Sequence, residues 1–140
     1  MMIVVGVLSE TGVFEWLALK LFRISKGSKA RLVTLFVLTT AILSAFLDNV
    51  TTVILITPIA LQITRIFKMN PFALMMPIIL ASHIGGTATL IGDPPNILIG
   101  AASGLSFNSF LQTLAIPVII IMTVILFQMK VVYRKDLSEN

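Results

Sequence analysis

The sequence predicts an all-α integral membrane protein, and two observations support this fold class. Hydrophobic residues make up 57% of the 140 residues, charged residues make up 11%, and the mean hydropathy is +1.04. A soluble domain of this size has too much surface for its volume to bury that many apolar side chains. The basic residues also lie at the ends of apolar segments, which is typical of membrane topology and argues against a nucleic-acid partner. The lipid bilayer is therefore the expected surrounding medium.

Residues 1–31 are predicted to contain the end of a truncated span and an interfacial helix. Residues 2–8 are apolar but too few to cross a hydrocarbon core, which needs about 20 residues as helix. We expect them to be the second half of a span in a partial transmembrane domain. Residues 13–24 mix apolar side chains with Glu15, Lys20 and Arg23 around Trp16. This mixture predicts an amphipathic helix at the membrane interface.

Residues 32–67 form two apolar segments separated by Asp48-Asn49. The first segment, residues 32–47, would rise about 24 Å as a helix, which is less than the roughly 30 Å of a hydrocarbon core. Asp48-Asn49 is then either an outside loop between two short spans or the tip of a helical hairpin within the membrane. The short first segment and the absence of Gly or Pro at the tip favour a re-entrant hairpin.

Residues 71–102 are predicted to form a discontinuous transmembrane helix. Pro71 is suited to the first turn of a helix, and the apolar segment 72–82 follows it. We expect the helix to break at residues 83–89 and again at residues 92–96, because glycines and two adjacent prolines oppose one regular helix. Residues 110–130 then supply the final, full-length span.

The basic residues agree with this order of segments. A hairpin returns to the side it left, and the broken span and the final span each cross once. All basic residues then face one side, which the positive-inside rule identifies as cytoplasmic: Lys20, Arg23, Lys26, Lys29, Arg31, Arg65, Lys68, Lys130, Arg134 and Lys135. The expected location is the plasma (inner) membrane.

The two polar breaks are the candidate ion- and substrate-binding site. An ionised side chain in the membrane costs roughly 2.5–3.5 kcal/mol on insertion scales, so Asp48 and Asp93 each need a partner or a function. Broken helices also expose backbone groups that bind ions. His83 is interpreted as a hydrogen-bonding residue at a helix end rather than a proton carrier. The candidate residues are Asp48, Asn49, Thr51, Thr52, Gly85, Gly86, Thr87, Thr89, Asp93, Pro94, Pro95 and Asn96.

An enzyme is not expected. The chain has no cysteine, and we find neither a nucleophile–base pair nor a metal-binding cluster in the sequence. No cofactor is predicted beyond Na⁺ or H⁺ as a coupling ion.

Two motifs resemble a known family. The segments AFLDNVTTVILITPIAL (residues 45–61) and GGTATLIGDPPNILIGAASGLSFNSFL (residues 85–111) are similar to the citrate-transporter-like domain of the ion transporter superfamily. The nearest branch is that of the arsenite-efflux and sodium/proton antiporter permeases, which includes the melanosomal P protein. The resemblance implies one partial repeat of an inverted-repeat secondary transporter. It also implies that a second repeat, from a separate chain or a homo-oligomer, completes the site for a small inorganic ion.

The hairpin tip departs from the family pattern. Asn49 matches the motif, but Asp48 stands where the carboxylate transporters carry Ser, and Val50 where they carry Thr. The added negative charge favours cation or proton coupling over a carboxylate substrate. The expected function is inorganic anion or arsenite efflux, or sodium/proton exchange. The alternatives are a non-transporting membrane fragment or assembly subunit, and a carboxylate transporter repeat.

Overall fold

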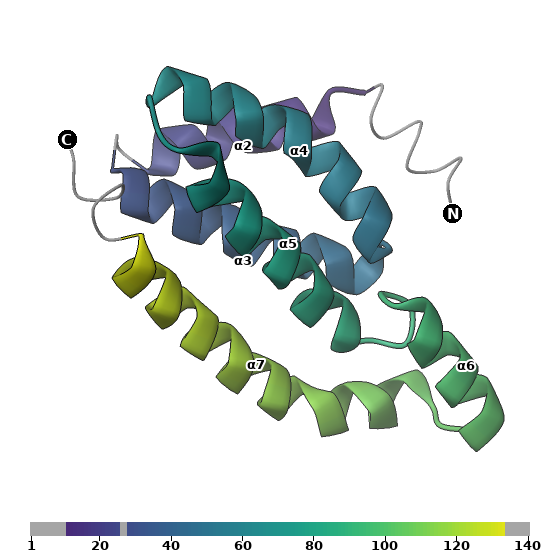
Figure 1. Ribbon diagram of the computed structural model, residues 1–140. Helices are drawn as coiled ribbons and strands as arrows, with labels where there is room; N and C mark the ends of the chain where they lie inside the picture. The colour runs from purple at the N-terminus through teal and green to yellow at the C-terminus, as the bar shows by residue number, and fades with distance from the viewer. Residues whose placement is uncertain (1–10, 26–27, 134–140) are drawn as a thin grey trace.

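The computed structural model describes residues 11–25 and 28–133, and every regular element in these ranges is a helix (Figure 1). The predicted all-α fold class is therefore confirmed. The expected span end at residues 2–8 lies outside the described residues. The helices are α2 (Val13–Ser25), α3 (Lys29–Phe46), α4 (Asn49–Ile66), α5 (Pro71–Thr87), α6 (Pro94–Ser103) and α7 (Phe107–Val132).

Three of these helices, α3, α4 and α7, are long and apolar enough to cross a membrane. The helices α3 and α4 have 18 residues each, which corresponds to a rise of about 27 Å. The helix α7 has 26 residues and rises about 39 Å. The helices α3 and α4 are thus clearly shorter than α7, and α7 begins at Phe107, three residues before the expected start of the final span at residue 110.

Local sequence explains where the helices begin and end. The Asn70 side chain accepts a hydrogen bond from the backbone N–H of Phe72 (3.1 Å), and Pro71 occupies the first turn of α5. Ser106 caps α7 in the same way. Gly104 ends α6 with φ of 67°, a left-handed conformation that glycine adopts without steric cost.

The helices α3 and α4 form an antiparallel hairpin, and α5 packs against both of them (Figure 1). Among the described helices, α3 and α5 form the most extensive contact. It buries apolar side chains that include Val33, Val37 and Ala41 on α3 and Leu74, Ile78 and Ala81 on α5. The turn between α3 and α4 consists of Leu47 and Asp48, so the hairpin tip is short. The tip lies beside the end of α5, where Gly86 contacts Asn49.

The predicted start of the helix break at residue 83 is wrong. The helix α5 continues through Gly85 and Gly86 to Thr87, and only residues 88–93 are non-helical. The glycines are explained by packing, because a Cβ on Gly85 would overlap the backbone carbonyl of Ala41 on α3. Small residues let two helices approach closely in a membrane, so Gly85 marks a helix contact rather than a break.

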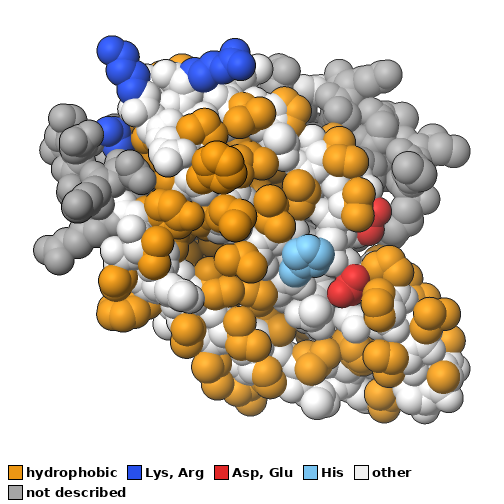
Figure 2. All heavy atoms as spheres, in the orientation of Figure 1, with side chains coloured by type: hydrophobic (Ala, Val, Ile, Leu, Met, Phe, Trp, Pro, Cys, Tyr) orange, Lys and Arg blue, Asp and Glu red, His pale blue; other side chains and the backbone are white. Residues whose placement is uncertain are grey.

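The described charged side chains separate along the face that Figure 2 shows. Figure 2 shows the Lys and Arg side chains of this face at one end, and a histidine and two acidic side chains farther along it, among hydrophobic side chains. In Figure 1 the beginning of α3, the turn between α4 and α5 and the end of α7 lie at one end of the bundle, as the basic-residue pattern predicts. The α3–α4 tip and the α5–α6 break lie at the other end.

Candidate functional site

Asn49 lies at the centre of the candidate site and is 5% exposed. Its side-chain Nδ2 donates a hydrogen bond to Oδ1 of Asp93 (3.1 Å) and lies 3.3 Å from Nδ1 of His83. Its Oδ1 accepts a hydrogen bond from the Ser44 hydroxyl (2.8 Å). One amide therefore connects the end of α3, the start of α4, the last part of α5 and the α5–α6 break.

The partners of Asn49 fix the orientation of its amide and the tautomer of His83. An ionised carboxylate can only accept hydrogen bonds, so the Asn49 NH₂ group must face Asp93. The same NH₂ group then donates its second hydrogen to Nδ1 of His83. A neutral His83 ring in this arrangement carries its proton on Nε2.

Asp48 caps the first turn of α4. Its Oδ1 accepts a hydrogen bond from the Thr51 backbone N–H (2.6 Å), and its Oδ2 accepts one from the Thr51 hydroxyl (2.7 Å). A carboxylate at this position is favourable because it compensates the positive end of the helix dipole. Within the described residues, neither Asp48 nor Asp93 forms an ion pair with a basic side chain. The two carboxylates therefore have no basic side-chain partner in the part of the chain that the structure describes.

The α5–α6 break is held in place by two polar side chains. The Thr89 hydroxyl donates to the Ala45 carbonyl of α3 (2.5 Å) and accepts a hydrogen bond from the Gly92 backbone N–H (3.1 Å). Asn96 Nδ2 donates to the carbonyls of Thr87 (3.3 Å) and Thr89 (3.0 Å). Asn96 thus caps the carbonyl end of α5 from within α6, which satisfies backbone groups that the break exposes.

The beginning of α6 is poorly suited to binding an anion. Asp93 is its N-cap residue but makes no side-chain capping hydrogen bond, because its carboxylate faces Asn49. Pro94 and Pro95 occupy the first turn and have no backbone N–H. Two of the donors that bind anions at helix N-termini are therefore missing.

Thr52 provides a buried oxygen with no partner. Its side chain is 1% exposed, and its Oγ1 forms no hydrogen bond within the described part of the chain. Most buried polar atoms in proteins are hydrogen-bonded. The unpaired hydroxyl lies one turn along α4 from Asp48.

The structure brings together some of the predicted residues and separates others. At the hairpin tip, Asn49 contacts Asp93, and Asp48 is hydrogen-bonded to Thr51. Gly86 lies against Asn49, so that a Cβ on Gly86 would overlap the Asn49 amide oxygen. Pro94 and Pro95 are exposed. The Thr87 side chain is also exposed and bonds back to Ile84 of its own helix.

Sequence reasoning missed Ser44 and misplaced His83. The Ser44 hydroxyl contacts Asn49 Oδ1 (2.8 Å) and the Ser82 carbonyl (2.6 Å). A single serine in an apolar helix commonly bonds back to the backbone of its own helix. The sequence around Ser44 therefore did not indicate a contact with another segment. His83 does make a hydrogen bond, as predicted, but it lies inside α5 rather than at a helix end.

Comparisons with known proteins match the whole chain. Residues 1–140 match the protein family described as citrate transporter. The chain is 50% identical to a 46 kDa membrane protein of Mycobacterium leprae, over 90% of this chain and 29% of that protein. It is 47% identical to an uncharacterized transporter of Mycobacterium tuberculosis, over 87% of this chain and 28% of that protein.

The human P protein is 35% identical to the chain, over 99% of this chain and 18% of that protein. The chain thus spans less than a third of the length of these relatives. No solved structure matches it.

Proposed function

The chain belongs to the citrate transporter family, and from this premise we propose that it contributes one half of the ion and substrate site of a secondary active transporter. The observation that carries the proposal is the hydrogen bond between Asn49 and Asp93. It joins the hairpin tip to the break in the α5–α6 span. Non-helical backbone within a membrane must be buried in protein or line a wet cavity, and transporters bind their ions at such breaks.

The charge of the site favours a cation, so the proposed coupling ion is Na⁺ or H⁺. Asp48 and Asp93 bring two carboxylates, and no basic side chain among the described residues is paired with either. The Thr52 hydroxyl adds an unpaired oxygen, and oxygen atoms are the ligands that hard cations prefer. The prolines at the start of α6 remove donors that an anion would use.

We propose that the second half of the site comes from another repeat, either in a separate chain or in a second copy of this chain. The length of the relatives supports this proposal, because the chain covers only 28–29% of the mycobacterial proteins. Large parts of α7 are exposed and apolar, including Ile116, Ile120 and Phe127. Such a surface suits lipid or a partner helix.

The proposal is tested by flux in proteoliposomes. The full chain, alone and with the product of any neighbouring gene, is reconstituted, and Na⁺-driven proton movement is followed with a pH-sensitive dye. Asp48→Asn and Asn49→Ala should abolish the flux, whereas Asn108→Ala, an exposed position on α7, should leave it unchanged.

Three outcomes would contradict parts of the proposal. Flux that persists in both site variants would show that the site is assigned wrongly. Uptake of labelled citrate with no movement of Na⁺ or H⁺ would favour a carboxylate carrier instead of a cation-coupled exchanger. No flux from any combination of chains would favour a non-transporting assembly subunit.

A further inference from the structure

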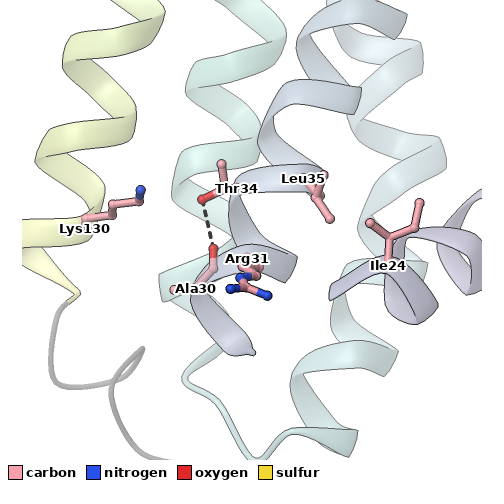
Figure 3. A pocket seen from close by; sticks show the side chains of 6 residues that line it. All are labelled: Ile24, Ala30, Arg31, Thr34, Leu35 and Lys130. Carbon is pink, nitrogen blue, oxygen red and sulfur yellow. Dashed lines mark hydrogen bonds between the residues drawn. The ribbon is translucent and has the colours of Figure 1, made fainter. Parts of the chain in front are cut away.

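A cavity of about 310 Å³ lies near the basic end of the molecule, remote from the hairpin tip. Three helices line it, as Figure 3 shows: α2, α3 and α7. The lining residues are Ile24, Ala30, Arg31, Thr34, Leu35 and Lys130.

Two cationic side chains from different helices border this cavity. Arg31 lies in the first turn of α3, and Lys130 lies in the last turn of α7 and projects toward α3 (Figure 3). None of the lining residues that the structure describes is acidic. Arginine can bind a phosphate group through two parallel hydrogen bonds, and lysine adds a point charge. The cavity therefore complements a phosphate group.

The helix α3 adds positive potential at the same place. Its N-cap residue, Ser28, makes no side-chain capping hydrogen bond, and its first turn contains no acidic residue, so within the described residues its first-turn N–H groups are not compensated by a cap or an acidic side chain. The Thr34 hydroxyl is already used, because it donates to the Ala30 carbonyl (2.8 Å). An anion in the cavity would thus meet the start of α3 together with Arg31 and Lys130.

An apolar surface continues from the cavity along α3. Leu38, Ile42 and Phe46 are spaced four residues apart and are 38%, 62% and 63% exposed. They follow Leu35 and Thr34 on one side of the helix, since residues three and four apart are neighbours on a helix surface. From Leu35 to Phe46 the helix rises about 17 Å, which is close to half of a hydrocarbon core of about 30 Å. The apolar surface is thus as long as one leaflet is deep.

We propose that this cavity binds the phosphate of an anionic phospholipid whose acyl chains lie along Leu38, Ile42 and Phe46. The two cations select the headgroup, and the apolar surface distinguishes a lipid from a free phosphate ion. Basic cavities between transmembrane helices on the cytoplasmic side are suited to anionic headgroups. The site is independent of the proposed transport activity, because it lies at the opposite end of the hairpin and its test measures binding alone.

The test uses the purified full chain in detergent micelles and native mass spectrometry to count bound lipid. Dioleoyl-phosphatidylglycerol should bind as a discrete adduct. Dioleoyl-phosphatidylcholine has the same acyl chains and no net charge, and it should bind at least fivefold more weakly. Inorganic phosphate should compete only at concentrations far above those of the lipid. Equal binding of the two lipids, or displacement by phosphate at matched concentration, would overturn the proposal.

Three variants and one control locate the site. Arg31→Gln and Lys130→Gln should each lower phosphatidylglycerol binding roughly fivefold, the size expected for one cation near a membrane surface. Ala30→Phe should block the cavity and reduce binding without a change of charge. Arg65→Gln removes the same charge from an exposed position on α4 that does not line the cavity, and it should have little effect.

Circular dichroism of each variant should show unchanged helix content, because Arg31 and Lys130 are exposed. A control variant that weakens binding as much as Arg31→Gln would show that general surface charge, not the cavity, attracts the lipid. Unchanged binding in Ala30→Phe would equally overturn the assignment.

Discussion

The side chain of Asn49 donates a 3.1 Å hydrogen bond to the carboxylate of Asp93, which lies 44 residues later in the chain. The bond connects the first residue of α4 to the residue that precedes α6. Because the same amide also contacts His83 and Ser44, a movement of the hairpin tip must change contacts in three other segments. The tip and the break are thus structurally coupled.

Asn49→Ala should destabilise the protein. The substitution removes the Asn49 donor from the part-buried Asp93 carboxylate, whereas the Ser44 hydroxyl keeps the Ser82 carbonyl as its acceptor. A buried polar group that loses its hydrogen-bond partner costs about 1–3 kcal/mol. Chemical denaturation in detergent, followed by circular dichroism, should show a lower free energy of unfolding. Asn108→Ala is the matched control, because Asn108 is exposed. A loss of stability in the control equal to that in Asn49→Ala would contradict this account.

His83 should carry its proton on Nε2 when its ring is neutral, because Nδ1 accepts from the Asn49 amide. The chain has a single histidine, so its ¹⁵N-labelled ring signals need no assignment. The ¹⁵N chemical shift of each ring nitrogen shows whether that nitrogen carries a proton, and the Nδ1 signal should be that of an unprotonated, hydrogen-bond-accepting nitrogen. A neutral ring protonated on Nδ1 would rule out the arrangement.

Gly85→Ala should be more destabilising than Gly100→Ala. A Cβ at position 85 meets the backbone carbonyl of Ala41, which cannot move without separating α3 from α5. A Cβ at position 100 meets only the flexible end of the Leu90 side chain. Alanine is favoured over glycine by about 1 kcal/mol within a helix, whereas overpacking costs about 1–3 kcal/mol. Thermal unfolding of both variants should therefore show a net loss at position 85 and little change at position 100.

Asp48→Asn should separate the structural role of Asp48 from its charge. Asparagine caps helices about as well as aspartate, so α4 and the overall helix content should be retained. The negative charge is lost, and with it the proposed attraction for Na⁺. Thermal unfolding with NaCl or choline chloride at equal ionic strength should show specific stabilisation by Na⁺ only in the wild type. The same stabilisation in Asp48→Asn would exclude this carboxylate as a determinant of Na⁺ binding.

The two ends of the bundle should be accessible from opposite sides of the membrane. The chain has no cysteine, so Lys68→Cys and Asn108→Cys each provide a single labelling position, and both residues are exposed. An impermeant maleimide added to intact cells should label Cys introduced at position 108, and permeabilisation should be needed for position 68. Labelling of both positions from the same side would contradict the expected topology.

Much of the fold could be predicted because its signals are local. An Asn-Pro pair starts α5, a Pro-Pro pair starts α6, and Asp48 caps α4 through the residue three positions later. The composition alone predicted a membrane protein, because a compact soluble domain of this length cannot bury so many apolar side chains. These features depend on neighbouring residues or on the chain as a whole, so the sequence was sufficient for them.

The tertiary structure determined the conformation of the glycines and the hydrogen-bond partners of the polar side chains. Gly85 and Gly86 suggested a break because glycine disfavours helices, but close packing against α3 and the hairpin tip holds them in α5. The partners of Asn49 lie 5, 34 and 44 residues away, and the two distant ones come from elements that meet only when α5 packs beside the hairpin. Local sequence determined the helices and their ends, whereas packing between helices determined which polar groups meet.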